Sequence, residues 1–254
     1  MDTSQAIEQA QALLAQARRV TVLSGAGMST ASGIPDYRGP KGLWTRDPDA
    51  EKLVTLEYYM GSADIRARSW QMRGESGVLQ AQPNAAHRAL LALERSGRLH
   101  ALVTQNIDGL QQLAGSDPSL VVEMHGTVRE SICMSCQARM PTTDVLSRIE
   151  QGERDPRCTL CQGIIKTATI YFGQSLETAA LERADRAARE CDVLLTVGTS
   201  LAVYPVALMV PTAKRAGAQV IIVNGGPTEM DALANVVVRG DLTEALPQVL
   251  AQVS

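Results

Sequence analysis

Six short runs of aliphatic and β-branched residues recur along this chain and limit what it can fold into. The runs lie at 19–24, 100–106, 120–125, 192–200, 219–226 and 235–241. Between several of them, apolar residues recur at the three- and four-residue spacing of helices, at 85–97, 179–191 and 205–217. Strands that are apolar on both faces and alternate with helices indicate a mostly parallel sheet covered by helices on both sides. The sequence therefore predicts an α/β fold.

Polar residues and glycines that suit a binding site follow these runs. They are Ser24, Gly25, Ala26, Gly27, Gln105, Asn106, Ile107, Asp108, His125, Gly198, Thr199, Ser200, Asn224 and Asp241. In open α/β sheets, ligands bind beyond the carboxyl ends of the strands. Ordinary turns also use glycine, asparagine and aspartate, which explains any one of these loops but seldom all of them. The sequence therefore predicts one site at the carboxyl edge of the sheet.

The first of these loops, SGAGMSTASGIPDYRG at 24–39, contains a Gly-x-Gly between a predicted strand and a predicted helix start. Glycine has no Cβ, so backbone N–H groups at such a turn can approach a pyrophosphate closely. The third glycine of the usual dinucleotide fingerprint is replaced by Thr30, and no strand that ends in an acidic residue follows at the usual distance. An ordinary dehydrogenase is therefore disfavoured, and this motif alone is weak evidence for a dinucleotide.

Two Cys-x-x-Cys pairs, Cys133 with Cys136 and Cys158 with Cys161, predict one tetrahedral zinc ion. Four thiolate ligands would leave no position for water or substrate, so this zinc would be structural. A redox-active pair is the alternative, although no helix start follows either motif. Disulfides are disfavoured in a chain without a secretory signal. Cys191 fits a small buried apolar residue.

Charge and hydropathy limit the partners of this chain. The formal net charge of −3 at pH 7 gives no general attraction to phosphate backbones, so we expect no direct binding of nucleic acid. No apolar stretch is long enough to span a membrane, and the first residues, MDTSQAIEQAQALL, lack the basic start and apolar core of a signal peptide. We therefore expect a cytoplasmic protein with no membrane partner.

Several motifs, taken together and in this order, resemble the sirtuins, the family of NAD-dependent protein deacylases. They are GAGMSTASGIPDYRG, TQNIDGL, MHGTV, the knuckle CMSC, the knuckle CTLC followed by YFGQSL, GTSLAVYP and GDLTEALP. The similarity runs from about Val20 to Leu250, which is nearly the whole chain. It implies NAD and a structural zinc as the cofactors, and acyl-lysine proteins or peptides as the partners.

The resemblance also implies a domain organisation. A Rossmann-like NAD-binding domain with a mostly parallel sheet is expected over 1–41, 83–128 and 170–254. A small domain is expected to be inserted into it, made of a helical insertion over 42–82 and a zinc ribbon over 129–169. NAD and the acyl-lysine peptide would enter the cleft between the two domains.

By the same resemblance, the strand-end residues would bind NAD. The NAD-binding residues expected are Gly25, Ala26, Gly27, Asp36, Tyr37, Arg38, Gln105, Asn106, Ile107, Asp108, Gly198, Thr199, Ser200, Asn224 and Asp241. Asp108 and the Ile107 backbone would hold the nicotinamide carboxamide, and Gln105 and Asn106 would orient the ribose and a nearby water.

His125, together with Asn106, is expected to be catalytic. The amide oxygen of the acyl-lysine would attack the ribose carbon that carries nicotinamide, and His125 would then take a proton from a ribose hydroxyl. A structural, hydrogen-bonded histidine is the alternative interpretation of His125, and we interpret His87 and His100 in that way.

The substrate-binding residues outside the helical insertion are expected on two segments. Ile170, Phe172, Gly173 and Val203 would contact the acyl-lysine, whose backbone would pair as a strand between 171–174 and 201–205.

In the helical insertion, Trp70 and Arg73 would stand where a tyrosine and an arginine occur in the desuccinylase branch of the family. Because Trp70 replaces the tyrosine, we predict no strong preference for succinyl groups. The alternative is a solvated helix face formed by Arg66, Arg68 and Arg73.

Three functions fit the sequence. We favour an NAD-dependent protein-lysine deacylase. A protein mono-ADP-ribosyltransferase that uses the same NAD pocket is the alternative. A non-catalytic NAD-sensing or zinc-ribbon module is disfavoured, because Asn106, Asp108 and His125 are all present and a binding module needs no base.

Overall fold

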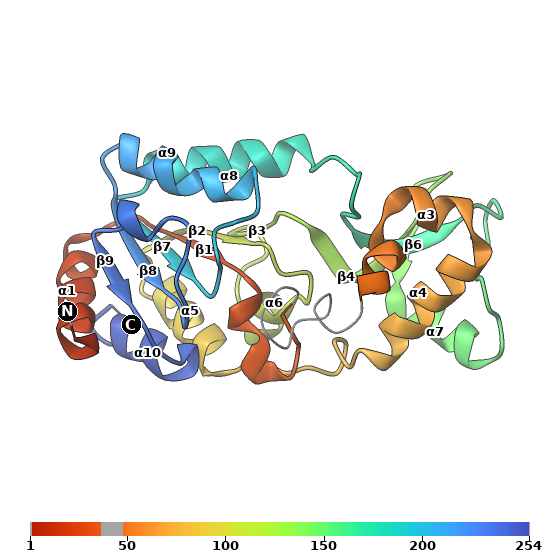
Figure 1. The fold of residues 1–254 in the computed structure, drawn as a ribbon, viewed down its shortest axis with the longest axis horizontal. Coiled ribbons are helices and arrows are strands. Elements are labelled where there is room, and N and C mark those ends of the chain that lie inside the picture. The colour runs from red at the N-terminus through yellow and green to blue at the C-terminus, as the bar shows by residue number, and fades with distance from the viewer. Residues whose placement is uncertain (1, 37–47, 254) are drawn as a thin grey trace.

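The main sheet contains six parallel strands in the order β3-β2-β1-β7-β8-β9 (Figure 1). The computed structural model describes residues 2–36 and 48–253. The strands are β1 (Val20–Ser24), β2 (Leu99–Thr104), β3 (Val121–Glu123), β7 (Val193–Val197), β8 (Gln219–Val223) and β9 (Val236–Val238). Each of the six predicted runs overlaps one of these strands, so the predicted α/β class is confirmed.

Helices cover both faces of this sheet. On one face lie α1 (Thr3–Gln16), α5 (Ala85–Arg95) and α10 (Leu242–Leu250), and on the other lie α8 (Thr178–Glu190) and α9 (Met209–Arg215) (Figure 1). Neighbouring residues of one strand enter different cores: Val22 packs toward α1, α5 and α10, and Leu23 toward α8 and α9. This double burial explains why the strands are continuously apolar. No helix within 2–36 and 48–253 is long and apolar enough to cross a membrane.

The predicted helices are confirmed, with one local difference. The stretches 85–97 and 179–191 form α5 and α8, whereas the stretch 205–217 divides into a short 3-10 helix, η4 (Val206–Leu208), and α9.

A small antiparallel sheet lies at the other end of the molecule (Figure 1). Its strand order is β5-β4-β6, with β4 (Gly126–Cys133), β5 (Arg139–Pro141) and β6 (Ile165–Thr169). The surrounding elements are α7 (Thr142–Glu150), the 3-10 helix η3 (Pro48–Val54), α3 (Leu56–Gly61) and α4 (Ala63–Glu75). One core, made of Trp70, Cys133, Val145, Cys158 and Ile165, joins α4 and α7 to the cysteine-bearing segments.

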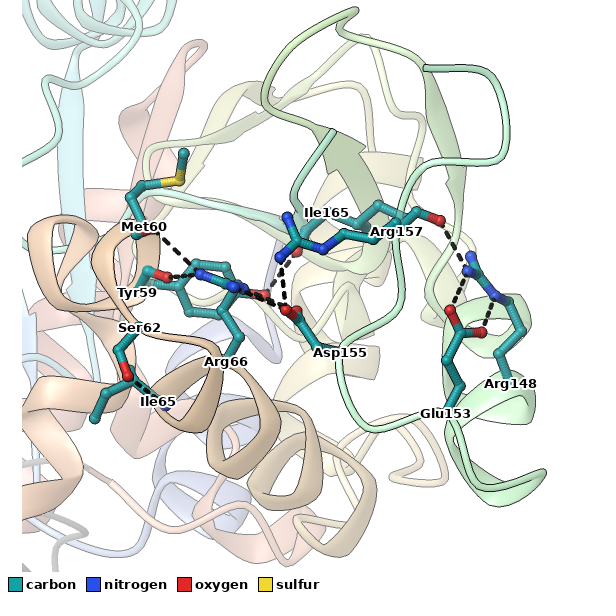
Figure 2. A network of polar contacts seen from close by, with 10 residues as sticks. All are labelled: Tyr59, Met60, Ser62, Ile65, Arg66, Arg148, Glu153, Asp155, Arg157 and Ile165. Carbon is teal, nitrogen blue, oxygen red and sulfur yellow. Dashed lines mark hydrogen bonds and ion pairs between the residues drawn. The ribbon is translucent and has the colours of Figure 1, made fainter. Parts of the chain in front are cut away.

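Arg66 ties α4 to the loop that precedes the second cysteine pair (Figure 2). Its Nε and Nη2 atoms donate to the two carboxylate oxygens of Asp155 at 2.8 and 2.7 Å. Its Nη1 atom donates to the carbonyl oxygens of Tyr59 and Met60, at the C-terminal end of α3. Arg66 is only 4% exposed, so the solvated helix face considered above is wrong for this residue.

Candidate functional site

The loops after β1, β2 and β7 meet at the centre of the sheet. The strand order turns back on itself between β1 and β7, which is the position where doubly wound sheets open a crevice. Asn106 donates through Nδ2 to the Gly25 carbonyl at 3.0 Å, and Gln105 donates through Nε2 to Thr199 Oγ1 at 3.1 Å. The structure therefore brings together the residues predicted at three of the strand ends.

The glycines of the first loop pack against the loop after β7. The N–H of Gly25 donates to the Val197 carbonyl at 3.0 Å, and the N–H of Gly27 donates to the Gly198 carbonyl at 2.9 Å. A Cβ at Gly25 would lie 2.7 Å from Thr199 Cβ, and one at Gly27 would lie 2.9 Å from Gly198 Cα. These glycines thus permit a close approach of two loops. The expectation that their N–H groups face the NAD phosphates is not supported, because both donate within the protein.

A buried hydrogen-bond chain fixes the side chains after β2. Asn106 Nδ2 also donates to Ser29 Oγ at 3.1 Å, and Ser29 Oγ donates to Asp108 Oδ2 at 2.7 Å. The other oxygen of Asp108 accepts the N–H of Leu110, at the start of α6 (Leu110–Ala114). Asp108 is 5% exposed. The amide and the carboxylate are therefore held in fixed orientations before any ligand arrives.

His125 follows β3, and its two ring nitrogens have different roles. Its Nδ1 lies 2.9 Å from the carbonyl oxygen of Gln105. A carbonyl only accepts, so Nδ1 carries the proton and the lone pair of the neutral ring lies on Nε2. Burial lowers the pKa of His125 below its usual value, and the hydrogen bond to Gln105 opposes this only in part. His125 is therefore neutral at pH 7 and can accept a proton at Nε2.

A tight turn after His125 leads directly into the small sheet. The carbonyl of His125 accepts the N–H of Ile170 at 2.8 Å. Gly126 has a φ of +69°, and a Cβ there would lie 2.1 Å from the Ala168 carbonyl oxygen. Only glycine fits both conditions. The position of the histidine is thereby tied to β6.

A cavity of about 440 Å³ opens beside these strand ends. Its lining includes Ala26, Ser29, Ile34, Asn106, Ile107 and Asp108 from the main domain, and Leu53, Val54, Met72, Arg73 and Val78 from the helical insertion. This size and mixed lining suit a small polar ring. The Nε of Arg73 is buried and has no hydrogen-bond partner among the residues that the structure describes.

Trp70 lies elsewhere. Its ring is 1% exposed and packs in the core of the small domain with Cys133 and Ile165. The structure thus corrects the expectation that Trp70 contacts the substrate, because its surface is already covered by apolar neighbours. Arg73, three residues further along α4, does reach the cavity wall.

The predicted NAD residues beyond β7 occupy the remaining strand ends. Asn224 follows β8 and donates through Nδ2 to the Gly226 carbonyl at 2.8 Å. Asp241 is the N-cap of α10, and the hydrogen bonds from the hydroxyl and N–H of Thr243 hold the pKa of its carboxyl below the usual value. Asp36 is the last described residue of the first loop, and the predicted ligands Tyr37 and Arg38 lie outside the described residues.

The predicted substrate residues lie on two segments. Phe172 is 38% exposed, and its backbone pairs with the helical insertion: its N–H donates to the Val54 carbonyl and its carbonyl accepts the N–H of Leu56, each at 2.9 Å. Val203 begins the turn into η4. Ile170 lines a second cavity beside the small sheet and not the cavity of 440 Å³.

The four predicted zinc ligands form one cluster. Their sulfur atoms all lie within 4.8 Å of one another, with 3.5 Å between Cys133 and Cys161 and 3.7 Å between Cys136 and Cys158. Tetrahedral zinc with Zn–S bonds of about 2.3 Å requires sulfur separations of about 3.8 Å. All four are free thiols. The donor set therefore fits a closed structural zinc.

The two cysteine pairs are built alike. In the first, Cys133 N–H donates to the Ala138 carbonyl, and in the second, Cys158 N–H donates to the Gly163 carbonyl. Gln137 and Gln162 follow the second cysteine of each pair, and both have a φ of 61°. This repeat holds the four sulfurs in position without a disulfide.

Two residues of the site were not found from the sequence. Ser29 links Asn106 to Asp108, and Arg129 donates through Nε to the Asp108 carbonyl at 2.7 Å. Both contacts join residues far apart in the chain, and no local pattern marks them.

Comparison with known proteins identifies close relatives of this arrangement. The model of the Sir2 family matches residues 25–205. NAD-dependent protein deacetylase 2 of Streptomyces coelicolor is 54% identical over 231 residues, which cover 91% of this chain and 96% of that protein. The NAD-dependent protein deacetylase of Sulfolobus acidocaldarius is 41% identical over 230 residues, which cover 91% and 88%.

Solved structures agree with these matches. A Sir2 histidine-to-alanine variant with a deacetylated p53 peptide and 3′-O-acetyl ADP-ribose matches with a TM-score of 0.89 at 33% identity, over 97% of this chain and 98% of that one. A Sir2 protein bound to a propionylated peptide matches with a TM-score of 0.86 at 31% identity, with the same coverage of 97% and 98%.

Proposed function

This chain belongs to the Sir2 family, and we infer from that membership that it is an NAD-dependent protein-lysine deacylase. Such an enzyme transfers the acyl group of a modified lysine to ADP-ribose and releases nicotinamide. The relatives above are named NAD-dependent protein deacetylases, and similar solved structures hold acetylated or propionylated peptides. These findings support deacylation over protein mono-ADP-ribosylation.

The observation that carries the proposal is the state of His125. The ring is half-buried and neutral, with its Nδ1 proton donated to the Gln105 carbonyl and its lone pair on Nε2. A neutral imidazole in this setting is a general base near pH 7. We assign to it the removal of the proton from the ribose hydroxyl that receives the acyl group.

NAD, when bound, supplies an electrophilic ribose carbon and nicotinamide as the leaving group. We propose that Asp108 and Ile107 hold the nicotinamide carboxamide, since both line the cavity of 440 Å³. Asn106, held by Ser29 and the Gly25 carbonyl, would orient the ribose. The remaining NAD contacts are proposed at Ala26, Asp36, Tyr37, Arg38, Gln105, Gly198, Thr199, Ser200, Asn224 and Asp241.

The peptide is proposed to lie between 171–174 and 201–205, with its acyl-lysine near Phe172 and Val203. The exposed ring of Phe172 supports this position. Main-chain pairing of this kind tolerates many substrate sequences. Arg73, whose Nε is buried and unpaired among the described residues, lines the cavity and is proposed to influence the choice of acyl group.

We further propose the domain boundaries given above and a cytoplasmic location. The shared core of α4, α7 and the cysteine pairs supports a small domain made of both insertions. Five free cysteines support a reducing compartment. Zinc, when bound by Cys133, Cys136, Cys158 and Cys161, would stabilise this domain and take no part in the reaction.

A product assay tests the proposed function. Zinc-loaded protein and NAD are incubated with peptides that carry acetyl-, propionyl-, succinyl- or long-chain acyl-lysine, and mass spectrometry follows free lysine, nicotinamide and acyl-ADP-ribose. We expect acyl-ADP-ribose from the wild type and from His100→Ala, a half-buried histidine beside Glu190, but not from His125→Ala. ADP-ribose attached to protein without deacylated peptide would identify a transferase instead.

A further inference from the structure

The second cavity, of about 600 Å³, is larger than the cavity beside the NAD residues. Its walls come from β4, β6, α6, the end of β3 and the first turns of α8. The two cavities share no lining residue within the described part of the chain. The volume lies in the range of small-molecule sites.

Arg129 gives this cavity a cation with one unused hydrogen-bond donor. Its Nε donates to the Asp108 carbonyl, and its stem passes over Gly109, where a Cβ would lie 2.7 Å from Arg129 Cδ. Its Nη2 is buried and has no hydrogen-bond partner in the described ranges 2–36 and 48–253. A buried N–H group without an acceptor is unfavourable, and a charged one more so. Arg129, which lines the cavity, is therefore fixed in place by its Nε and retains donor capacity that the described residues do not use.

The charge of the lining restricts the ligand that Arg129 could bind. The charged lining residues are three cations, Arg129, Arg139 and Lys166, and three carboxylates, Glu123, Glu130 and Glu177. Glu130 is neutralised by Arg139 at 2.6 Å. Because the formal charges balance, the cavity has no net attraction for a polyanion such as a nucleotide. Arg129 already interacts electrostatically with Asp108 and Glu123, so the cavity has room for no more than one further negative charge beside it.

The remaining lining restricts the rest of the ligand. It is apolar over Leu113, Ile132, Met134, Ala168, Ile170 and Ala180. An aliphatic body would be buried favourably against these side chains. We propose that this cavity is a second binding site, for a small organic monocarboxylate whose carboxylate pairs with the Arg129 guanidinium and whose apolar body packs along β4 and α8.

Calorimetric titration of zinc-loaded protein with octanoate tests the proposal without NAD or peptide, so its outcome does not depend on the proposed deacylase function. We expect one octanoate per chain. Arg129→Gln should weaken binding by at least about tenfold, because a hydrogen bond to a charged group is lost. Arg154→Gln is the matched control, since its side chain is 81% exposed, and it should leave the affinity unchanged.

Ile132→Glu supplies an independent variant should Arg129→Gln fail to fold. Ile132 is half-buried and lines the cavity, so a carboxylate there should repel octanoate and abolish the heat of binding while the circular dichroism spectrum is retained. Octanoate binding that survives both folded variants would lie elsewhere, as in the acyl-lysine pocket, and would overturn the proposal. Equal binding of 1-octanol, displacement by inorganic phosphate, or no binding of octanoate would overturn it as well.

Discussion

The ion pair between Arg66 and Asp155 is expected to be a major contributor to the stability of the small domain. The side chain of Arg66 is 5% exposed and that of Asp155 is 18% exposed. Removing one partner of a buried ion pair costs about 3–5 kcal/mol, because it leaves an uncompensated charge. In Asp155→Ala, Arg66 keeps the carbonyls of Tyr59 and Met60 as acceptors, so we expect the lower end of that range, about 3 kcal/mol.

Arg66→Met should behave differently. Asp155 keeps Arg157 as its partner at 2.9 Å, so the charge left behind is still paired. The loss then comes from two carbonyls at the end of α3 without their donor, about 1–3 kcal/mol. In the double variant no unpaired buried guanidinium remains, so its destabilisation should fall short of the sum of the two single values by about 1 kcal/mol or more.

Denaturant unfolding followed by the fluorescence of Trp70 measures these values, since the ring lies in the core next to this network. Trp44→Phe in every variant removes the second tryptophan of the chain, and zinc is kept saturating throughout. A loss below about 1 kcal/mol in Asp155→Ala, or strict additivity in the double variant, would refute the argument that Arg66 is a desolvated charge held by Asp155.

Three further outcomes are expected. Burial lowers the pKa of Lys166 from 10.5 to about 8, so the unfolded chain binds its proton more tightly and stability should rise with pH between these values. Lys166→Met should flatten this rise, as measured by denaturant unfolding across pH. The methyl group of Gly163→Ala would lie 2.8 Å from Cys133 Sγ, so the zinc affinity measured by chelator competition should fall about tenfold or more. Gly74→Ala is the control, because its Cβ would have its nearest contact at 3.8 Å, and it should keep the metal. Because the pKa of His125 is lowered, the decline of deacylation with falling pH should be centred below the ordinary value of 6.5; a decline centred above pH 6.5 would contradict the burial argument.

The strands and the zinc cluster could be predicted from the sequence for local reasons. Val20–Ser24 and Val193–Val197 are buried at every position, so their apolar runs are continuous and visible in the sequence. The cysteine pairs are also local, since a two-residue spacer already directs both sulfurs toward one ion. The convergence of Asn106, Asp108 and His125 followed from one topological rule, because the carboxyl ends of parallel strands share an edge.

Only the tertiary structure decided what several of the predicted residues contact. The sequence predicted a phosphate-binding loop at Gly25 and Gly27, but their N–H groups donate to the carbonyls of Val197 and Gly198, which are far away in sequence. Trp70 was predicted to contact the substrate, but its ring packs in the core with Cys133 and Cys158. No pattern in the sequence pointed to the contact between Arg129 and Asp108. Hydrophobic periodicity records whether a position is buried; which distant residue covers it, and whether its last hydrogen-bond donor is satisfied, depends on how the elements pack.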